Sequence, residues 1–242
     1  MPVEGSDEQK QTNEILTAAP LLDKCEIAGK VITADALLTQ HKLASYIVGR
    51  GADYHLTAKG NQPHLQEAIT TAFDNRSDTP DFVEVTPPDH GRIETRSIWC
   101  STAVNKYLKF PSVGQVFLIK RETVNKKTSK STCEIVVGLT SQTPAQASPE
   151  KVLAVNRGHW CIEAAHYVID WNFNEDRSRI RTKFGPENTT LLRRLATSVL
   201  RLFQKPGQSI ATMMRRLGSN NRMVLDYLRM TKNSVPVAMR GI

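Results

Sequence analysis

The pattern of apolar and polar positions over the first 73 residues predicts alternating helices and strands. Residues 30–35 form a short β-branched apolar run that ends in an acid, which is typical of a buried parallel strand. Residues 53–59 show a second run of this kind. The spacing of apolar residues predicts helices before, between and after these strands, at 13–22, 40–50 and 65–73. This alternation favours an α/β fold.

The pattern changes after residue 74. Short alternating segments separated by turn residues predict an antiparallel β unit, with strands at 82–85, 92–100, 116–121 and 133–139. Residues 141–148 have the composition of a linker, and the chain then becomes helical, with helices expected at 150–171, 186–203, 209–217 and 222–230. We therefore expect three parts: 1–73, a β-rich insertion at 74–148 and a helical region at 149–242.

Composition limits the classes of protein to which this chain can belong. Of 242 residues, 40% are hydrophobic and 23% are charged, which is ordinary for a globular chain. No apolar run approaches the length of a membrane span, and the N-terminus lacks the apolar stretch of a secretory signal. Four scattered cysteines without a Cys-x-x-Cys pair favour neither a zinc site nor a disulfide framework. These features predict a cytoplasmic protein without a membrane partner.

The positive charge is concentrated in the last third of the chain. The net charge is +8, and residues 157–242 hold 15 Lys and Arg against 6 Asp and Glu, whereas residues 1–156 hold 17 against 18. Such an asymmetry indicates contact with a polyanion, most often a nucleic acid. A solvated helix face rich in arginine is the alternative.

Three sets of residues are candidates for chemistry. Asp35 ends the first predicted strand, where ligands bind in α/β proteins, although a helix cap or a loop acid has the same pattern. His159, Glu163, His166 and Asp170 share one helix face, so they are either a metal-binding stripe or the solvated side of an amphipathic helix. Three alternating arginines further on are either phosphate contacts or members of a surface ion-pair network: Arg177, Arg179 and Arg181.

Several segments together resemble one known family. Asp-Ala, Lys-Gly-Asn-Gln, His-Gly-Arg-Ile-Glu-Thr-Arg and His-Trp-x-Ile-Glu follow one another in this order within residues 31–63, 90–100 and 156–181, and a further match covers 186–196. This combination resembles bacterial insertion-sequence transposases of the DDE type, the ISAs group.

The resemblance implies a ribonuclease H-like core, interrupted by the antiparallel β unit and followed by the helical region. Such enzymes use two Asp and one Glu to hold two Mg²⁺ ions, with Mn²⁺ as an alternative, and they cut and join phosphodiester bonds. Asp35 matches the second catalytic Asp and Glu163 the catalytic Glu, and both would bind metal. The implied partner is double-stranded DNA, as terminal inverted repeats and as target. The DNA contacts are expected at Lys59, Asn61, Gln62, Arg92, Arg96, Arg157, His159, Arg177, Arg179 and Arg181.

The chain also departs from the family pattern. The segment with the first catalytic Asp has no counterpart in residues 1–242, so the resemblance implies a truncated copy whose core lacks its first strands. We expect such a chain to be inactive alone, because two carboxylates do not fix two Mg²⁺ ions. The alternative functions are a DNA-binding remnant that inhibits full-length transposase and, behind it, a metal-binding helical protein. The expected assembly is a homodimer or a pair with full-length transposase, in the bacterial cytoplasm beside the nucleoid.

Overall fold

A computed structural model describes residues 7–89 and 92–232, and the chain divides into two compact units, Met1–His159 and Trp160–Ile242. Each unit is described here by itself. The division into 1–73, 74–148 and 149–242 does not coincide with this boundary and stays a prediction.

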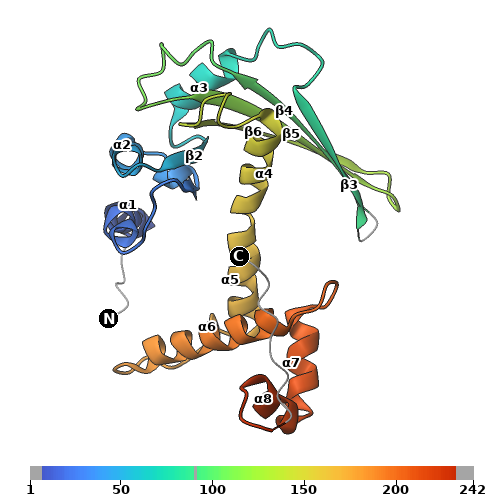
Figure 1. The fold of residues 1–242 in the computed structure, drawn as a ribbon. Helices are drawn as coiled ribbons and strands as arrows, with labels where there is room; N and C mark the ends of the chain where they lie inside the picture. The colour runs from blue at the N-terminus through green and yellow to red at the C-terminus, as the bar shows by residue number, and fades with distance from the viewer. Residues whose placement is uncertain (1–6, 90–91, 233–242) are drawn as a thin grey trace. The chain divides into compact units, whose positions relative to one another are not determined.

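The first unit is built on a mixed sheet with the strand order β1-β2-β6-β5-β4-β3 (Figure 1). Its strands are β1 (Val31–Ala34), β2 (Asp53–Ala58), β3 (Phe82–Asp89), β4 (Arg92–Ser101), β5 (Gln115–Asn125) and β6 (Ser131–Thr140). β1 and β2 are parallel, and every other pairing in this order is antiparallel. The expected α/β class and the expected strands are confirmed.

The β-rich segment continues the sheet of the α/β part, because β6 pairs with β2 and places Leu139 opposite Leu56. Gly138 makes this approach possible, since a Cβ atom there would lie 2.4 Å from the Leu56 carbonyl oxygen and 2.4 Å from the Phe117 ring. The Thr140 hydroxyl also donates to the Tyr54 carbonyl oxygen at 2.7 Å. The strands predicted as a separate β unit therefore share one sheet with β1 and β2.

Helices cover both faces of this sheet (Figure 1). One face carries Tyr54, Leu56 and Trp99, and it packs against apolar residues of α1 (Asp7–Asp23), α2 (His41–Gly49) and α3 (Pro63–Thr71). The other face carries Ile98, Phe117 and Ile119, and Val152 and Leu153 of α4 (Pro149–His159) pack on it. β1 is one edge of the sheet, so the strand that ends at Asp35 has a single neighbour in the described residues.

The second unit is helical. It contains α5 (Cys161–Tyr167), a π-helical turn (Val168–Asn172), α6 (Gly185–Phe203), α7 (Ile210–Gly218) and α8 (Asn221–Tyr227). Leu200, Ile210 and Met213 are its most buried apolar residues, and Phe203 stacks on Tyr227 with ring centres 4.2 Å apart. None of the helices in the described residues is long and apolar enough to cross a membrane.

The prediction of one helix over 150–171 is wrong. α4 ends at His159, Trp160 lies in a turn, and α5 then runs into the π-helical turn. The interruption coincides with the boundary between the two units. The end of α4 is hydrogen-bonded to the sheet, as described next.

Candidate functional site

Asp35 lies directly after β1, at the carboxyl end of the parallel pair. Its backbone is extended (φ −72°, ψ 175°), and it caps the short 3₁₀ helix Ala36–Leu38 through an Oδ1 that accepts from the Leu38 amide at 3.4 Å. The cap anticipated as an alternative is therefore present, but the bond is long. The side chain is exposed, and no other hydrogen bond of this carboxylate is found in the described residues. Most of its acceptor capacity is therefore available to a cation or to water.

Side chains from the loop after β2 hold the loop that begins at Asp35. The Asn61 side-chain amide donates to the Ala36 carbonyl oxygen at 2.6 Å, and that of Gln62 donates to the Thr39 carbonyl oxygen at 3.1 Å. The buried Thr39 hydroxyl donates to the Thr57 carbonyl oxygen of β2 at 2.6 Å. Asn61 and Gln62, which were expected to contact DNA, thus fix the backbone that carries the candidate carboxylate.

Two polar contacts attach the end of α4 to the same two strands. His159 Nδ1 lies 3.1 Å from the Thr33 hydroxyl oxygen of β1, and the Asn156 amide nitrogen lies 3.4 Å from His55 Nε2 of β2. Thr33 and His55 are direct neighbours across the parallel pair. Thr33, two residues before Asp35, therefore lies on the face of the sheet that α4 covers.

His55 is uncharged in this arrangement. The ring stacks on Phe117 with centres 4.5 Å apart and is buried. Burial, with a smaller effect from the nearby His159, lowers the pKa of His55 to about 3. At neutral pH, Nε2 of the neutral ring can accept the Asn156 amide proton, so the contact holds α4 on the sheet without a buried charge.

Arg96 and Arg157, both expected to contact DNA, have acidic partners within the first unit. Arg96 donates to Glu94 at 2.6 Å and to the Thr86 hydroxyl oxygen at 3.2 Å. Arg157 of α4 forms an ion pair with Glu84 of β3. A phosphate contact by either guanidinium would have to share or replace these partners.

The other expected DNA contacts are exposed and divide between the two units. Lys59 and Arg92 are exposed in the first unit, whereas Arg177, Arg179 and Arg181 are exposed in the second. Arg177 lies in a turn and over the Trp171 ring, 4.9 Å from its centre. The three arginines therefore do not form the single extended row that their alternation suggested.

Glu163 lies in α5, and its side chain is outside the described part of the structure. Among the side chains that are described, no three His, Cys, Asp or Glu groups lie close enough together to hold a metal ion. The four cysteines are free in the structure. The sequence reasoning missed Thr39, His55, Asn156 and Glu84, and a histidine in the middle of an otherwise buried strand was the one local signal among them.

A comparison with known protein families identifies the family of this chain. Residues 3–199, most of the chain, match the family described as "Transposase DDE domain". The chain belongs to the DDE transposase family. The expectation of a DDE transposase is therefore confirmed at the level of the family.

Relatives agree with this assignment. The chain is 29% identical over 203 residues to "Putative transposase YncI" of Escherichia coli O157:H7, covering 80% of this chain and 51% of that protein. It is 28% identical over 204 residues to "H repeat-associated putative transposase YhhI" of Escherichia coli (strain K12), covering 79% of this chain and 52% of that protein. The chain thus spans about half the length of these DDE transposase relatives.

A solved structure, the "piggyBac transposase synaptic complex with hairpin DNA", aligns with 99% of this chain and 47% of its own chain. The TM-score is 0.37 and the sequence identity 13%, so this likeness supports no argument about the chain.

Proposed function

We propose that this chain carries part of the active site of an insertion-sequence transposase of the ISAs group, which cuts and joins phosphodiester bonds at the ends of its element. The observation that carries the proposal is the Asp35 carboxylate, exposed at the carboxyl end of a parallel strand pair and mounted on a loop that Asn61 and Gln62 hold. The family match supports the reaction class. In this proposal β1, β2 and α4 belong to a ribonuclease H-like core.

Glu163 is the proposed second carboxylate. It follows His159 by four residues, and His159 contacts Thr33 on the strand that ends at Asp35. The family match, which includes Glu163, supports this assignment.

Asp35 and Glu163 suit Mg²⁺ or Mn²⁺, because hard cations prefer carboxylate oxygens and Asp35 has acceptor capacity to spare. When bound, the ions would activate the attacking oxygen and stabilise the leaving oxygen. The protein's own part is to orient Asp35 through Asn61, Gln62 and Thr39 and to fix α4 through Asn156 and His159. Two carboxylates are too few for two ions, so we propose that the 242-residue chain does not cut DNA by itself.

The proposed partner is double-stranded DNA, both the terminal inverted repeats and the target. The proposed assembly is a homodimer or a pair with full-length transposase, in the bacterial cytoplasm beside the nucleoid. A second candidate function is a DNA-binding remnant that inhibits full-length transposase. The excess positive charge of residues 157–242 favours it, because that charge serves DNA binding without any metal site.

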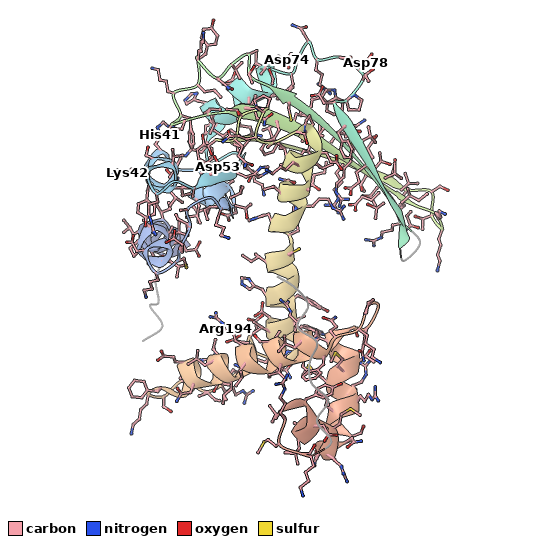
Figure 2. All side chains as sticks on the ribbon, in the orientation of Figure 1. His41, Lys42, Asp53, Asp74, Asp78 and Arg194 are labelled. Atoms are coloured by element: carbon pink, nitrogen blue, oxygen red, sulfur yellow. The ribbon has the colours of Figure 1, made fainter. Side chains whose placement is uncertain are left out.

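Cleavage assays on the whole reading frame, including any codons before Met1, test the proposal. We expect nicking of a plasmid with the element ends in Mg²⁺ or Mn²⁺, and loss of nicking in Asp35→Asn and Glu163→Gln with DNA binding unchanged. Asp78→Asn, in the exposed loop between α3 and β3 (Figure 2), is the matched control and should cut normally. Nicking by Asp35→Asn at the unsubstituted rate would overturn the proposed site.

The same assay separates the two candidate functions. The 242-residue chain should not nick the plasmid, and nicking by that chain would refute the proposed inactivity. If it lowers nicking by the whole reading frame when added in excess, the inhibitor function gains support.

A further inference from the structure

The end of the helical unit has a charge imbalance that the proposed active site does not use. Between Asn188 and Lys232 the chain holds nine basic residues and a single acidic one, Asp226. The basic residues are Arg193, Arg194, Arg201, Lys205, Arg215, Arg216, Arg222, Arg229 and Lys232. None of the last eight has an acidic partner among the described residues, whereas Arg193 lies 3.8 Å from Glu175. Asp226 accepts a hydrogen bond from the Thr231 hydroxyl.

On α7, the basic residues lie away from the apolar cluster and are exposed. Ile210, Met213 and Leu217 pack into the apolar cluster of the unit. At 100° per residue these three positions define one side of the helix, Arg215 lies opposite them, and Arg216 lies at the flank next to Met213. Both arginines are exposed, and Arg215 donates to the Thr212 hydroxyl oxygen at 3.2 Å, on the same outer side.

α8 repeats the arrangement. Val224, Tyr227 and Leu228 line an apolar pocket together with residues of α6 and α7, while Arg222 lies on the opposite side of the helix and is exposed. Ser209 and Asn220 cap the starts of α7 and α8 by accepting from the amides three residues on, at 3.2 Å each. The two short helices are therefore held by caps and a shared apolar core, with arginines on their outer sides.

We infer that the outer sides of α7 and α8 bind the phosphate backbone of double-stranded DNA through Arg215, Arg216 and Arg222. Guanidinium groups suit this partner because each can donate two hydrogen bonds to one phosphate. The inference rests on the proposed function for its partner, DNA, and adds the residues that would bind it, but it needs neither Asp35 nor Glu163.

The aromatic residues favour duplex over single-stranded nucleic acid. Single-strand binding uses aromatic rings on which bases stack. Phe203 and Tyr227 are the aromatic residues of 188–232, and they stack on each other within the apolar cluster. The outer sides of α7 and α8 therefore offer charge and hydrogen-bond donors but no ring for a base. A contact of this kind reads no sequence and depends strongly on salt.

The test measures binding of the full 242-residue chain to a short random-sequence duplex by fluorescence anisotropy at several salt concentrations. We expect Arg215→Gln/Arg216→Gln/Arg222→Gln to weaken binding at least about tenfold at low salt. It should also reduce the slope of log K against log[salt] by about 2–3, because each lost phosphate contact removes about 0.9. The matched control, Lys126→Gln/Lys127→Gln/Lys130→Gln, removes the same charge from exposed positions at the β5–β6 turn and should leave the slope unchanged.

Three results would overturn the inference. Equal losses in the two triple variants would show that net charge alone governs binding, and an unchanged slope in the arginine variant would show that these residues do not contact phosphate. Tighter binding to single strands, or to vesicles containing phosphatidylserine, would identify a different partner. Asp35→Asn should bind the duplex normally, so failure of the carboxylate site and failure of this surface are distinguishable.

Discussion

Acidification should weaken the first unit through His55. Its pKa is lowered from 6.5 to about 3, first by burial and second by the charge of His159. Between these two values the unfolded chain binds a proton at His55 that the folded chain does not. Stability due to the neutral ring is therefore complete above pH 6.5 and is lost as the pH falls towards 3.

The size of the effect follows from the shift. Each pH unit in this window costs about 1.4 kcal/mol, so lowering the pH from 6.5 to 5 should remove about 2 kcal/mol from the free energy of unfolding. His55→Gln keeps a neutral acceptor for Asn156 but cannot be protonated. It should begin less stable, because it loses the ring stack on Phe117, yet it should lack this pH dependence.

Urea unfolding at several pH values measures the difference. Trp99 is buried in the first unit, whereas Trp160 and Trp171 are exposed in the second, so Trp160→Phe/Trp171→Phe leaves Trp99 as the reporter. His41→Gln, at an exposed position of α2, is the control and should keep the full dependence. If His55→Gln loses as much stability between pH 6.5 and 5 as the unsubstituted chain, the account of His55 is wrong.

Two further substitutions test how the sheet positions Asp35. Thr39→Val leaves the Thr57 carbonyl oxygen without its donor and should cost about 1–3 kcal/mol, seen as faster amide exchange over 36–40, while Thr39→Ser should retain most of the protection. Gly138→Ala places a methyl group 2.4 Å from the Leu56 carbonyl oxygen and from the Phe117 ring, and should cost about 1–3 kcal/mol in the same urea assay. Gly60→Ala, where a Cβ meets nothing within 4 Å, is its control, and equal costs at the two glycines would contradict the close packing of β2 against β6.

The local features of this site could be predicted because they depend on neighbours in sequence. The β-branched run before Asp35 and the turn after β2 place an acid and two amides at the same edge of the sheet, since parallel strands end on the same side. Residues 30–35 and 53–59 were expected as strands, and β1 and β2 lie within these ranges. The sequence pattern does not predict which atoms Asn61 and Gln62 contact, because these contacts depend on the exact path of the loop from Ala36 to Thr39.

The contacts that the sequence pattern did not predict join residues far apart along the chain. Arg157 and Glu84 are 73 residues apart, and Asn156 and His55 are 101 residues apart. An arginine with such a partner has the same sequence pattern as one that faces solvent or DNA. The periodicity of apolar residues also predicted one continuous helix across Trp160. A one-residue interruption changes the phase of the apolar positions too little to be detected in the sequence.

The contrast between the arginines has a consequence for DNA binding. Arg96 and Arg157 sit beside Glu94 and Glu84, so a phosphate would compete with a carboxylate that is already in place. Arg215, Arg216 and Arg222 have no acidic partner among the described residues, and a phosphate there would displace only water and counterions. Releasing counterions is what drives binding to duplex DNA. A count of charges along the sequence does not distinguish these two groups of arginines. In the folded chain, the arginines of α7 and α8 should contribute more to DNA affinity, because they have no competing carboxylate.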